Sequence, residues 1–149
     1  MVRRTNESKV QAVRALARLA RALERSSGDL NLAHYRVLAA VADGDERASR
    51  VAERLALGKP TVSAAVESLC KRGLLRREVS GDDRRVARLS PTPAGEAALA
   101  EVEEVMVGRI EEILRRTEDP DAVIAALAQV GPALDEIAAE RAARRKEKK

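Results

Sequence analysis

Residues 48–89 constrain the fold of this chain more than any other stretch, because two helical patterns are followed there by a hairpin pattern. In the first helical pattern, apolar residues recur at helical spacing and charged residues fall on the opposite side; the apolar residues are Val51, Ala52, Leu55 and Ala56. Gly58 tolerates a left-handed backbone, and Pro60 cannot continue a helix. We therefore expect this helix to end around Leu57 in a sharp turn.

A second helix is predicted directly after the turn, because Pro60 suits the first turn of a helix and Gly73 suits its end. Its inward residues are expected to be Val62, Ala65 or Val66, and Leu69. The residues left to point outward are Thr61, Ser63, Ala64, Glu67 and Ser68. Small and hydrogen-bonding side chains on an exposed helix can approach base edges in a major groove of DNA.

The hairpin pattern follows Gly73. Residues 74–79 have the length of a strand, residues 80–83 form a turn cluster, and Ala87 and Leu89 alternate with Arg88 in a return strand. Pro91 lacks a backbone donor, so we expect it to shorten the second strand. Two arginines at the hairpin tip suit a narrow, strongly negative minor groove. The layout is that of a winged helix-turn-helix, and DNA binding is the leading hypothesis.

Several motifs resemble the MarR family of multiple-antibiotic-resistance-type transcriptional regulators: the run LALGKPTVSAAVESLCKRGLLRR, the pair Asp83 and Arg85, and the segment 92–95. The segment 30–38 is similar to the second helix of that family, so the resemblance covers nearly the whole chain. Two residues depart from the pattern, namely Pro91 in place of an aliphatic strand residue and Gly58 in place of a capping serine. The resemblance implies a mostly α fold with a small β-hairpin wing, flanked by N- and C-terminal dimerisation helices.

The length of 149 residues fits one compact protomer, and the near absence of aromatic residues requires a core of Ala, Leu, Val and Ile on helices. We treat 1–149 as a single MarR-like protomer. Residues 30–91 form its winged helix-turn-helix DNA-binding part, 8–26 and 92–140 its dimerisation helices, and 141–149 a basic tail that we expect to be frayed or disordered.

The first predicted helix, from about Ser8 to Arg25, carries an apolar face opposite a stripe of arginines; these are Arg14, Arg18, Arg21 and Arg25. The stripe is interpreted either as a solvated face or as a contact to an anion or to acidic helices of a partner subunit. A second helix is expected over 32–43. A small winged domain cannot cover the apolar faces of the flanking helices, so we expect a homodimer built across a twofold axis.

After residue 91, Thr92 is expected to cap a long helix reaching about Arg116. The inward residues of that helix are expected to be Leu99, Val102, Met106, Ile110 and Ile113. A final helix should be kinked or split near Gly131 and Pro132. Its apolar residues are Val123, Leu127, Val130, Leu134 and Ile137.

Charge is divided unevenly along the chain. Residues 47–90 hold eleven Lys/Arg and five Asp/Glu, a net of +6, whereas residues 91–140 hold three and twelve, a net of −9. The first segment suits contact with an anion such as DNA. No apolar run approaches the roughly 18–20 residues of a membrane span, and the N-terminus does not resemble a signal peptide. We expect a soluble, cytoplasmic protein.

Enzyme motifs are missing from the sequence. There is no nucleophile elbow, phosphate loop or metal-ligand cluster, and one histidine and one cysteine do not make a zinc site. The prediction is therefore a protein that is not an enzyme and needs no cofactor or metal. The single cysteine, Cys70, is interpreted as an inert, partly buried thiol rather than a redox sensor.

The function predicted from these residues is a sequence-specific, homodimeric DNA-binding transcriptional regulator, a repressor that reads a pseudo-palindromic operator with half-sites about 10 base pairs apart. Major-groove contacts are assigned to Lys59, Thr61, Ser63, Ala64 and Glu67, with Ser68 a weaker candidate. Arg85 is assigned to the minor groove, oriented by Asp83, with Arg84 on a neighbouring phosphate. Contacts to the DNA backbone are assigned to Arg72, Arg76 and Arg77.

The family resemblance also implies a small-molecule effector, often a phenolic or carboxylate compound, that binds between the dimer helices and the winged domain. The pocket candidates are Arg14, Arg18, His34, Tyr35 and Arg109. Two alternatives stay open at this point: a DNA-binding or architectural protein that is indifferent to sequence, and a winged helix used for protein contacts.

Overall fold

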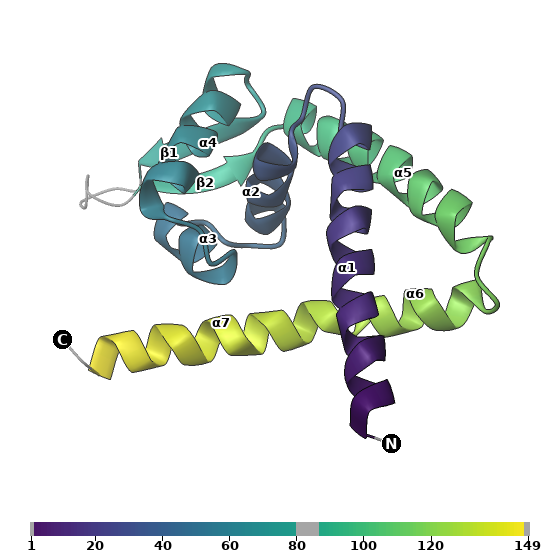
Figure 1. Cartoon of the computed structure of the whole chain (residues 1–149). Helices are drawn as coiled ribbons and strands as arrows, with labels where there is room; N and C mark the ends of the chain where they lie inside the picture. Colours follow the sequence, from purple (N-terminus) through teal and green to yellow (C-terminus); the bar gives the residue numbers. More distant parts are fainter. Residues whose placement is uncertain (1, 80–86, 148–149) are drawn as a thin grey trace.

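The computed structural model of the chain describes residues 2–79 and 87–147. Its elements are α1 (Val2–Ser26), α2 (Leu32–Ala42), α3 (Ala48–Arg54), α4 (Lys59–Lys71), β1 (Leu75–Val79), β2 (Ala87–Pro91), α5 (Pro93–Leu114), α6 (Pro120–Ala128) and α7 (Val130–Glu147). Helices α2 to α4 and the two strands form a compact winged body, from which α5 leads away (Figure 1). The predicted mostly α fold with a two-stranded wing is confirmed.

The hydrophobic core lies inside this winged body. Its fully buried side chains come from three helices and include Val37, Leu38, Val51, Val62, Val66 and Leu69. Leu74, Leu75 and Leu89 continue the same core into the wing. Burying one such Val or Leu side chain stabilises the fold by about 1.5–3 kcal/mol, so the core of the winged body fixes how α4 is oriented.

The turn between α3 and α4 differs from the prediction. Helix α3 ends at Arg54, and the left-handed residue of the turn is Ala56, with φ 51°, whereas Gly58 has φ −64° and is the N-cap of α4. The backbone N–H groups of Ala56 and Leu57 donate to the carbonyls of Glu53 and Ala52, at 3.2 and 3.1 Å. This pair of bonds closes the helix end, and it requires the left-handed conformation two residues before Gly58.

The wing is a two-stranded antiparallel sheet in which Leu75 pairs with Pro91 and Val79 with Ala87. The expectation that Pro91 shortens the second strand is wrong, because β2 includes Pro91. Beyond this pair, the N–H of Thr92 donates to the carbonyl of Leu74 at 3.1 Å. That bond makes Leu75 and Pro91 a non-hydrogen-bonded pair, so the nitrogen of Pro91 faces away from β1 and the missing donor costs the sheet nothing.

Helix α5 begins where the sequence predicts. The Thr92 hydroxyl accepts a hydrogen bond from the N–H of Gly95 at 3.0 Å and donates one to the carbonyl of Gly73 at 2.6 Å. Gly95 itself is buried against the backbone of Leu74. Thr92 and Gly95 therefore join the start of α5 to the residues that connect α4 with β1.

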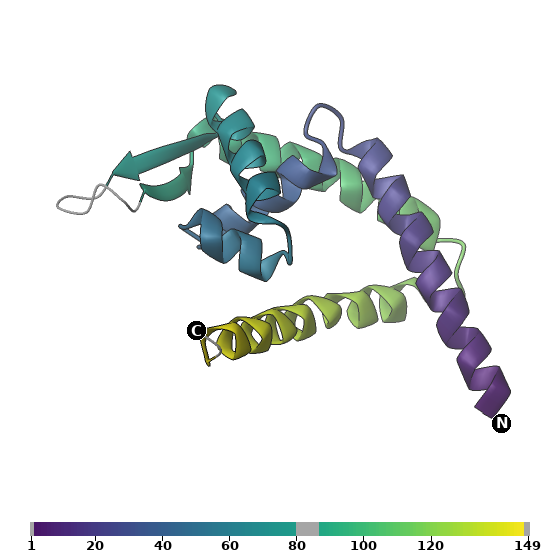
Figure 2. The same ribbon diagram turned by 60° about the vertical axis from the view of Figure 1, so that its left-hand side comes forward.

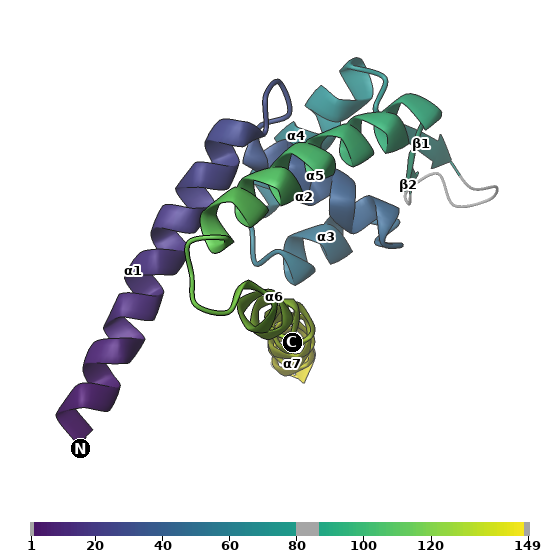
Figure 3. The ribbon, with the colours of Figure 1, turned by 90° about the vertical axis from the view of Figure 1, so that its right-hand side faces the viewer.

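Three helices extend beyond the winged body. The N-terminal half of α1 projects away from the other elements, and α6 and α7 run back beneath α3 (Figures 2 and 3). The predicted split of the final helix is confirmed, with the break at Gln129. Helix α7 continues to Glu147, so the expectation of a frayed tail is wrong for the described residues 141–147.

Large exposed hydrophobic side chains gather outside the winged body. Among the described residues they all lie on α1, α5, α6 or α7, and they are Val10, Val13, Leu16, Val105, Val107, Ile124, Val130, Leu134 and Ile137. Contrary to our expectation, the segment Pro120–Arg145 is apolar and long enough for a membrane span by length and composition. The helix break at Gln129 interrupts this segment, and the protomer buries none of its most apolar part.

Candidate nucleic-acid interface

Helix α4 is divided into a buried and an exposed face, as the sequence predicts. Val62, Ala65, Val66 and Leu69 are buried, so both Ala65 and Val66 face the core. The exposed residues are Lys59, Thr61, Ser63, Ala64 and Glu67, whereas Ser68 is half-buried. Gly58 supplies no side-chain cap to the first turn, whose N–H groups remain available to an anion. The exposed face of α4 therefore presents small and hydrogen-bonding groups above a rigid core.

One residue of this face has a competing partner. Glu67 accepts a salt bridge from Lys71, with Nζ and Oε1 2.9 Å apart on an exposed surface. The hydrogen bond from Lys71 and its positive charge lower the pKa of Glu67. The carboxylate is therefore an acceptor at neutral pH, and a base that donates to it must displace an exposed ion pair of small net strength.

The three arginines assigned to the DNA backbone differ in their contacts. Arg72 donates from Nη1 to the carbonyl of Asp29 at 3.2 Å, which ties the end of α4 to the loop before α2. Arg76 donates from Nε to the Ser90 hydroxyl at 2.8 Å and also contacts Glu78 at 3.0 Å. Arg77 is exposed and shares a shallow groove with Glu67 and Lys71. Arg72 and Arg76 are held by the fold, and Arg77 has no ion pair in the described part of the chain.

The wing-tip residues Asp83, Arg84 and Arg85 lie outside the described residues. Their assigned roles stay predictions. The strands on either side, β1 and β2, project the wing away from the body on the side opposite α1 (Figures 2 and 3).

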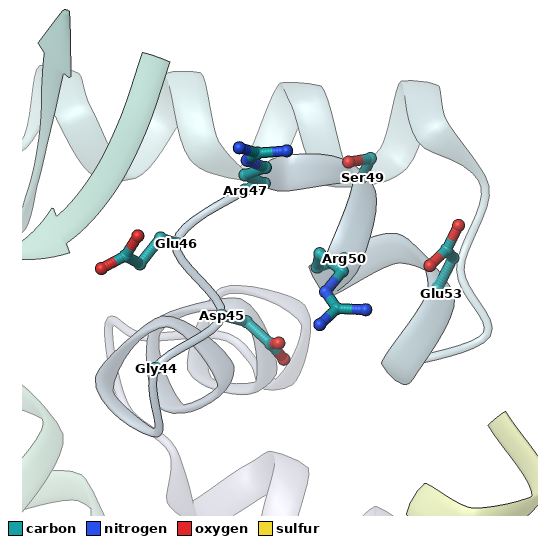
Figure 4. A pocket seen from close by; sticks show the side chains of 7 residues that line it. All are labelled: Gly44, Asp45, Glu46, Arg47, Ser49, Arg50 and Glu53. Carbon is teal, nitrogen blue, oxygen red and sulfur yellow. The ribbon is translucent and has the colours of Figure 1, made fainter. Parts of the chain in front are cut away.

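Residues at the start of α3 add to the basic surface and were not singled out by sequence reasoning. Arg47, Ser49 and Arg50 are exposed around a depression between α3 and the loop that follows α2 (Figure 4). This loop is fixed to the wing, because the N–H of Leu89 donates to the carbonyl of Glu46 at 2.7 Å. The only signal in the sequence was the net positive charge of residues 47–90. In Figure 4, Arg50 points into the depression toward Asp45, so positively and negatively charged side chains both line this depression.

Arg54 connects the winged body to the C-terminal helix. Its guanidinium group contacts three carboxylates: Asp43 at 3.0 Å, Asp45 at 3.4 Å and Asp135 of α7 at 3.0 Å. The hydrogen bond to Asp135 is the main cause that raises the pKa of Arg54. The sequence placed Arg54 on the solvated side of α3 and offered no sign of this partner, which lies 81 residues away in the chain.

The five effector-pocket candidates do not share one cavity. Arg18 and Arg109 line the same hollow, of about 440 Å³, between α1 and α5. Tyr35 lines a different groove, of about 570 Å³, bounded by α2, α3 and α7. Arg14 and His34 line neither of these two hollows.

The two candidates on α2, His34 and Tyr35, both have shifted pKa values. The Tyr35 hydroxyl donates to Glu103 of α5 at 3.4 Å, and burial together with that carboxylate raises the pKa of Tyr35. Burial, followed by the charge of Arg72, lowers the pKa of His34, whose Nδ1 is buried without a hydrogen-bond partner in the protomer. His34 is therefore neutral and packed in the first turn of α2. The hydroxyl of Tyr35 links α2 to α5.

Comparison with known proteins finds a family whose model matches the winged part of the chain. A family model described as the MarR family matches residues 28–86. The structure of the transcriptional repressor CouR bound to a 23-mer DNA duplex is 26% identical, covering 83% of this chain and 89% of CouR with a TM-score of 0.69. A MarR-family transcriptional regulator from Silicibacter pomeroyi is also 26% identical, covering 87% and 89% of the two chains with a TM-score of 0.65.

Bordetella bronchiseptica BpsR, whose DNA binding is regulated by 6-hydroxynicotinic acid, is 23% identical and shares the fold, covering 83% of this chain and 96% of BpsR with a TM-score of 0.67. A search of curated proteins finds no significant match. The family match includes α2, α3, α4 and β1, and the similar structures extend over the flanking helices as well. Residues 28–86 therefore match the MarR family of transcriptional regulators, and the chain shares its winged helix-turn-helix fold with a solved regulator of that family and with the DNA-bound repressor CouR.

Proposed function

We propose that this protein is a homodimeric repressor that reads a pseudo-palindromic operator and is released from it by a small-molecule effector. The observation that carries the proposal is the exposed face of α4, where Thr61, Ser63 and Ala64 stand opposite a fully buried apolar face. A helix held this rigidly presents its outer residues at fixed positions to the edges of bases in a major groove.

Within the proposal, Lys59, Thr61, Ser63, Ala64 and Glu67 address bases, and Arg85 enters the minor groove. Arg77 of β1 and Arg47 and Arg50 at the start of α3 are exposed and join the contacts to phosphate. We expect Arg85→Ala to weaken operator binding by about 1–3 kcal/mol while leaving the protein a dimer. Fluorescence anisotropy with labelled operator, together with sedimentation, measures both quantities; unchanged affinity would remove the wing tip from the mechanism.

The homodimer is supported by the uncovered apolar side chains on α1 and on α5 to α7. Exposed apolar surface of this kind is unfavourable in water and is typical of protein interfaces. A second copy that covers Ile124, Val130 and Leu134 also accounts for the apolar character of the segment Pro120–Arg145 without a membrane. In this proposal the protein works in the cytoplasm, where its operator is.

The proposal of an effector is supported by two hollows, one between α1 and α5 and the other bounded by α2, α3 and α7. The groove lined by Tyr35 lies between the winged body and α7, so a ligand there contacts both parts. In this proposal, the relative position of the two parts sets the distance between the two copies of α4 in the dimer. DNA binding by BpsR is regulated by a small organic acid. The proposed effector of this protein is likewise a small phenolic or carboxylate compound, or another anion.

The proposal is tested by selecting bound duplexes from a random DNA pool. Binding of the selected duplex and of a scrambled control is then measured across a series of salt concentrations. We expect an enriched inverted repeat with half-sites about 10 base pairs apart, preferred over the control by about a thousandfold or more.

Two other outcomes would contradict the proposal. Equal affinity for both duplexes with a steep dependence on salt would identify a DNA-binding protein that ignores sequence. The absence of binding to either duplex would identify a winged helix used for protein contacts.

A further inference from the structure

We infer that four arginines at the crossing of α1 and α5 form a binding site for a small multivalent oxyanion, a compound with several phosphate or carboxylate groups. The four are Arg18, Arg21 and Arg25 of α1 and Arg109 of α5. That such an anion acts as the effector rests on the proposed function, whereas its binding to this site does not.

The geometry follows from helical spacing. Arg18, Arg21 and Arg25 are separated by three and four residues, so they occupy one side of α1, and Arg109 approaches the same space from α5. Ala22 and Ser26, both half-buried, complete the lining of this hollow of about 440 Å³. A hollow of this size is within the range of small-molecule sites.

The charges in the hollow are only partly balanced. Arg21 pairs with Glu24 and Arg109 pairs with Glu112, each pair lying along its own helix. Arg18 and Arg25 form no ion pair in the described part of the chain, and none of the residues that line the hollow is acidic. Like charges three and four residues apart destabilise a helix, so an anion bound among the four guanidinium groups relieves a repulsion that the free protein carries.

The identity of the groups points to phosphate or carboxylate. A guanidinium fork donates two parallel hydrogen bonds to either group, and four forks around one hollow match a ligand with several of them. The strands β1 and β2 project from the side of the molecule opposite α1, so this hollow is separate from the wing (Figures 2 and 3).

The test uses the full-length protein without DNA, titrated in a calorimeter with pyrophosphate and separately with citrate at constant ionic strength. The double variant Arg18→Gln/Arg25→Gln removes the two unpaired cations. The control is Arg14→Gln, which removes a cation of the same stripe that does not line the hollow. We expect saturable binding of one anion per protomer, weakened about tenfold or more in the double variant and little changed in the control.

The two anions distinguish the groups recognised: tighter pyrophosphate binding indicates an organic phosphate as the natural ligand, and tighter citrate binding indicates a polycarboxylate. Absence of saturable binding, or equal weakening by Arg14→Gln, would overturn the inference. The inference would also be overturned if the protein bound neither anion and the double variant changed from dimer to monomer. That result would mean that acidic helices of the partner subunit occupy the hollow. Since no operator is present, failure here leaves the proposed operator binding untouched.

Discussion

Ala56 shows how a single backbone angle closes the helix-turn-helix. Its φ of 51° lies in the left-handed region, where a Cβ atom costs about 1–2 kcal/mol relative to the right-handed conformation. The two hydrogen bonds that end α3 hold the residue there. The turn therefore carries strain that glycine would not have.

We expect Ala56→Gly to raise the free energy of unfolding by about 0.5–1 kcal/mol, which is the relieved strain less the extra chain entropy of an unfolded glycine. Urea unfolding at a fixed protein concentration measures the change. Ala97→Gly, at an exposed position inside α5, is the control and should lower stability by about 0.5–1 kcal/mol. A loss of stability in both variants would mean that position 56 carries no strain.

Between elements, Gly95 of α5 lies close against the backbone of Leu74, the residue that precedes β1. A Cβ atom added at Gly95 would lie 2.0 Å from the carbonyl oxygen of Leu74, and backbone cannot yield as a flexible side chain can. The wing also starts at this point, because the N–H of Thr92 bonds to the same carbonyl.

We therefore expect Gly95→Ala to lower the free energy of unfolding by about 1–3 kcal/mol or more, through overpacking. Gly108→Ala in the same helix is the matched control, since a Cβ atom there meets nothing within 4 Å in the protomer. That variant should be neutral or stabilising by up to about 1 kcal/mol. Thermal unfolding of both proteins compares them; similar melting temperatures would show that α5 does not press on Leu74.

The second contact between elements is the ion pair of Arg54 and Asp135, which joins α3 to α7. Both groups are partly exposed, so its contribution to global stability should stay below about 1 kcal/mol. We expect Asp135→Asn to speed hydrogen exchange of the α7 amides around position 135, because α7 is docked on the winged body there. The control is Glu136→Gln, the adjacent acid, which forms no ion pair among the described residues. Equal exchange in both variants would show that the ion pair does not hold α7 in place.

At the scale of the whole molecule, the protomer leaves apolar helix faces uncovered. Val13 of α1 is 67% exposed, although it belongs to a regular apolar stripe. If that stripe is covered by a second copy, a buried charge placed on it is costly because it lacks a partner.

We expect Val13→Glu to shift the protein from dimer to monomer in sedimentation velocity, and to weaken binding to a two-half-site operator. Gln11→Glu adds the same charge to the polar side of α1 and should change neither quantity. A Val13→Glu protein that remains a dimer would place the dimer interface elsewhere.

What the sequence determined by itself is local. The inward and outward residues of α4, the Thr92 cap, the wing and the uncovered apolar stripes all follow from spacing within one element, since side chains three or four residues apart in a helix, or two apart in a strand, share a face. These features were predicted correctly.

Tertiary structure decided whatever depends on how distant segments approach each other. The left-handed residue is Ala56 because two hydrogen bonds close the end of α3, although Gly58 is the residue better suited to that angle. Arg54 meets Asp135, and the arginines of α1 meet Arg109, because the packing of α1 on α5 and of α7 on α3 brings segments over eighty residues apart together. Spacing along a chain fixes which face a side chain lies on, but the partner of that face is set by packing of the whole fold.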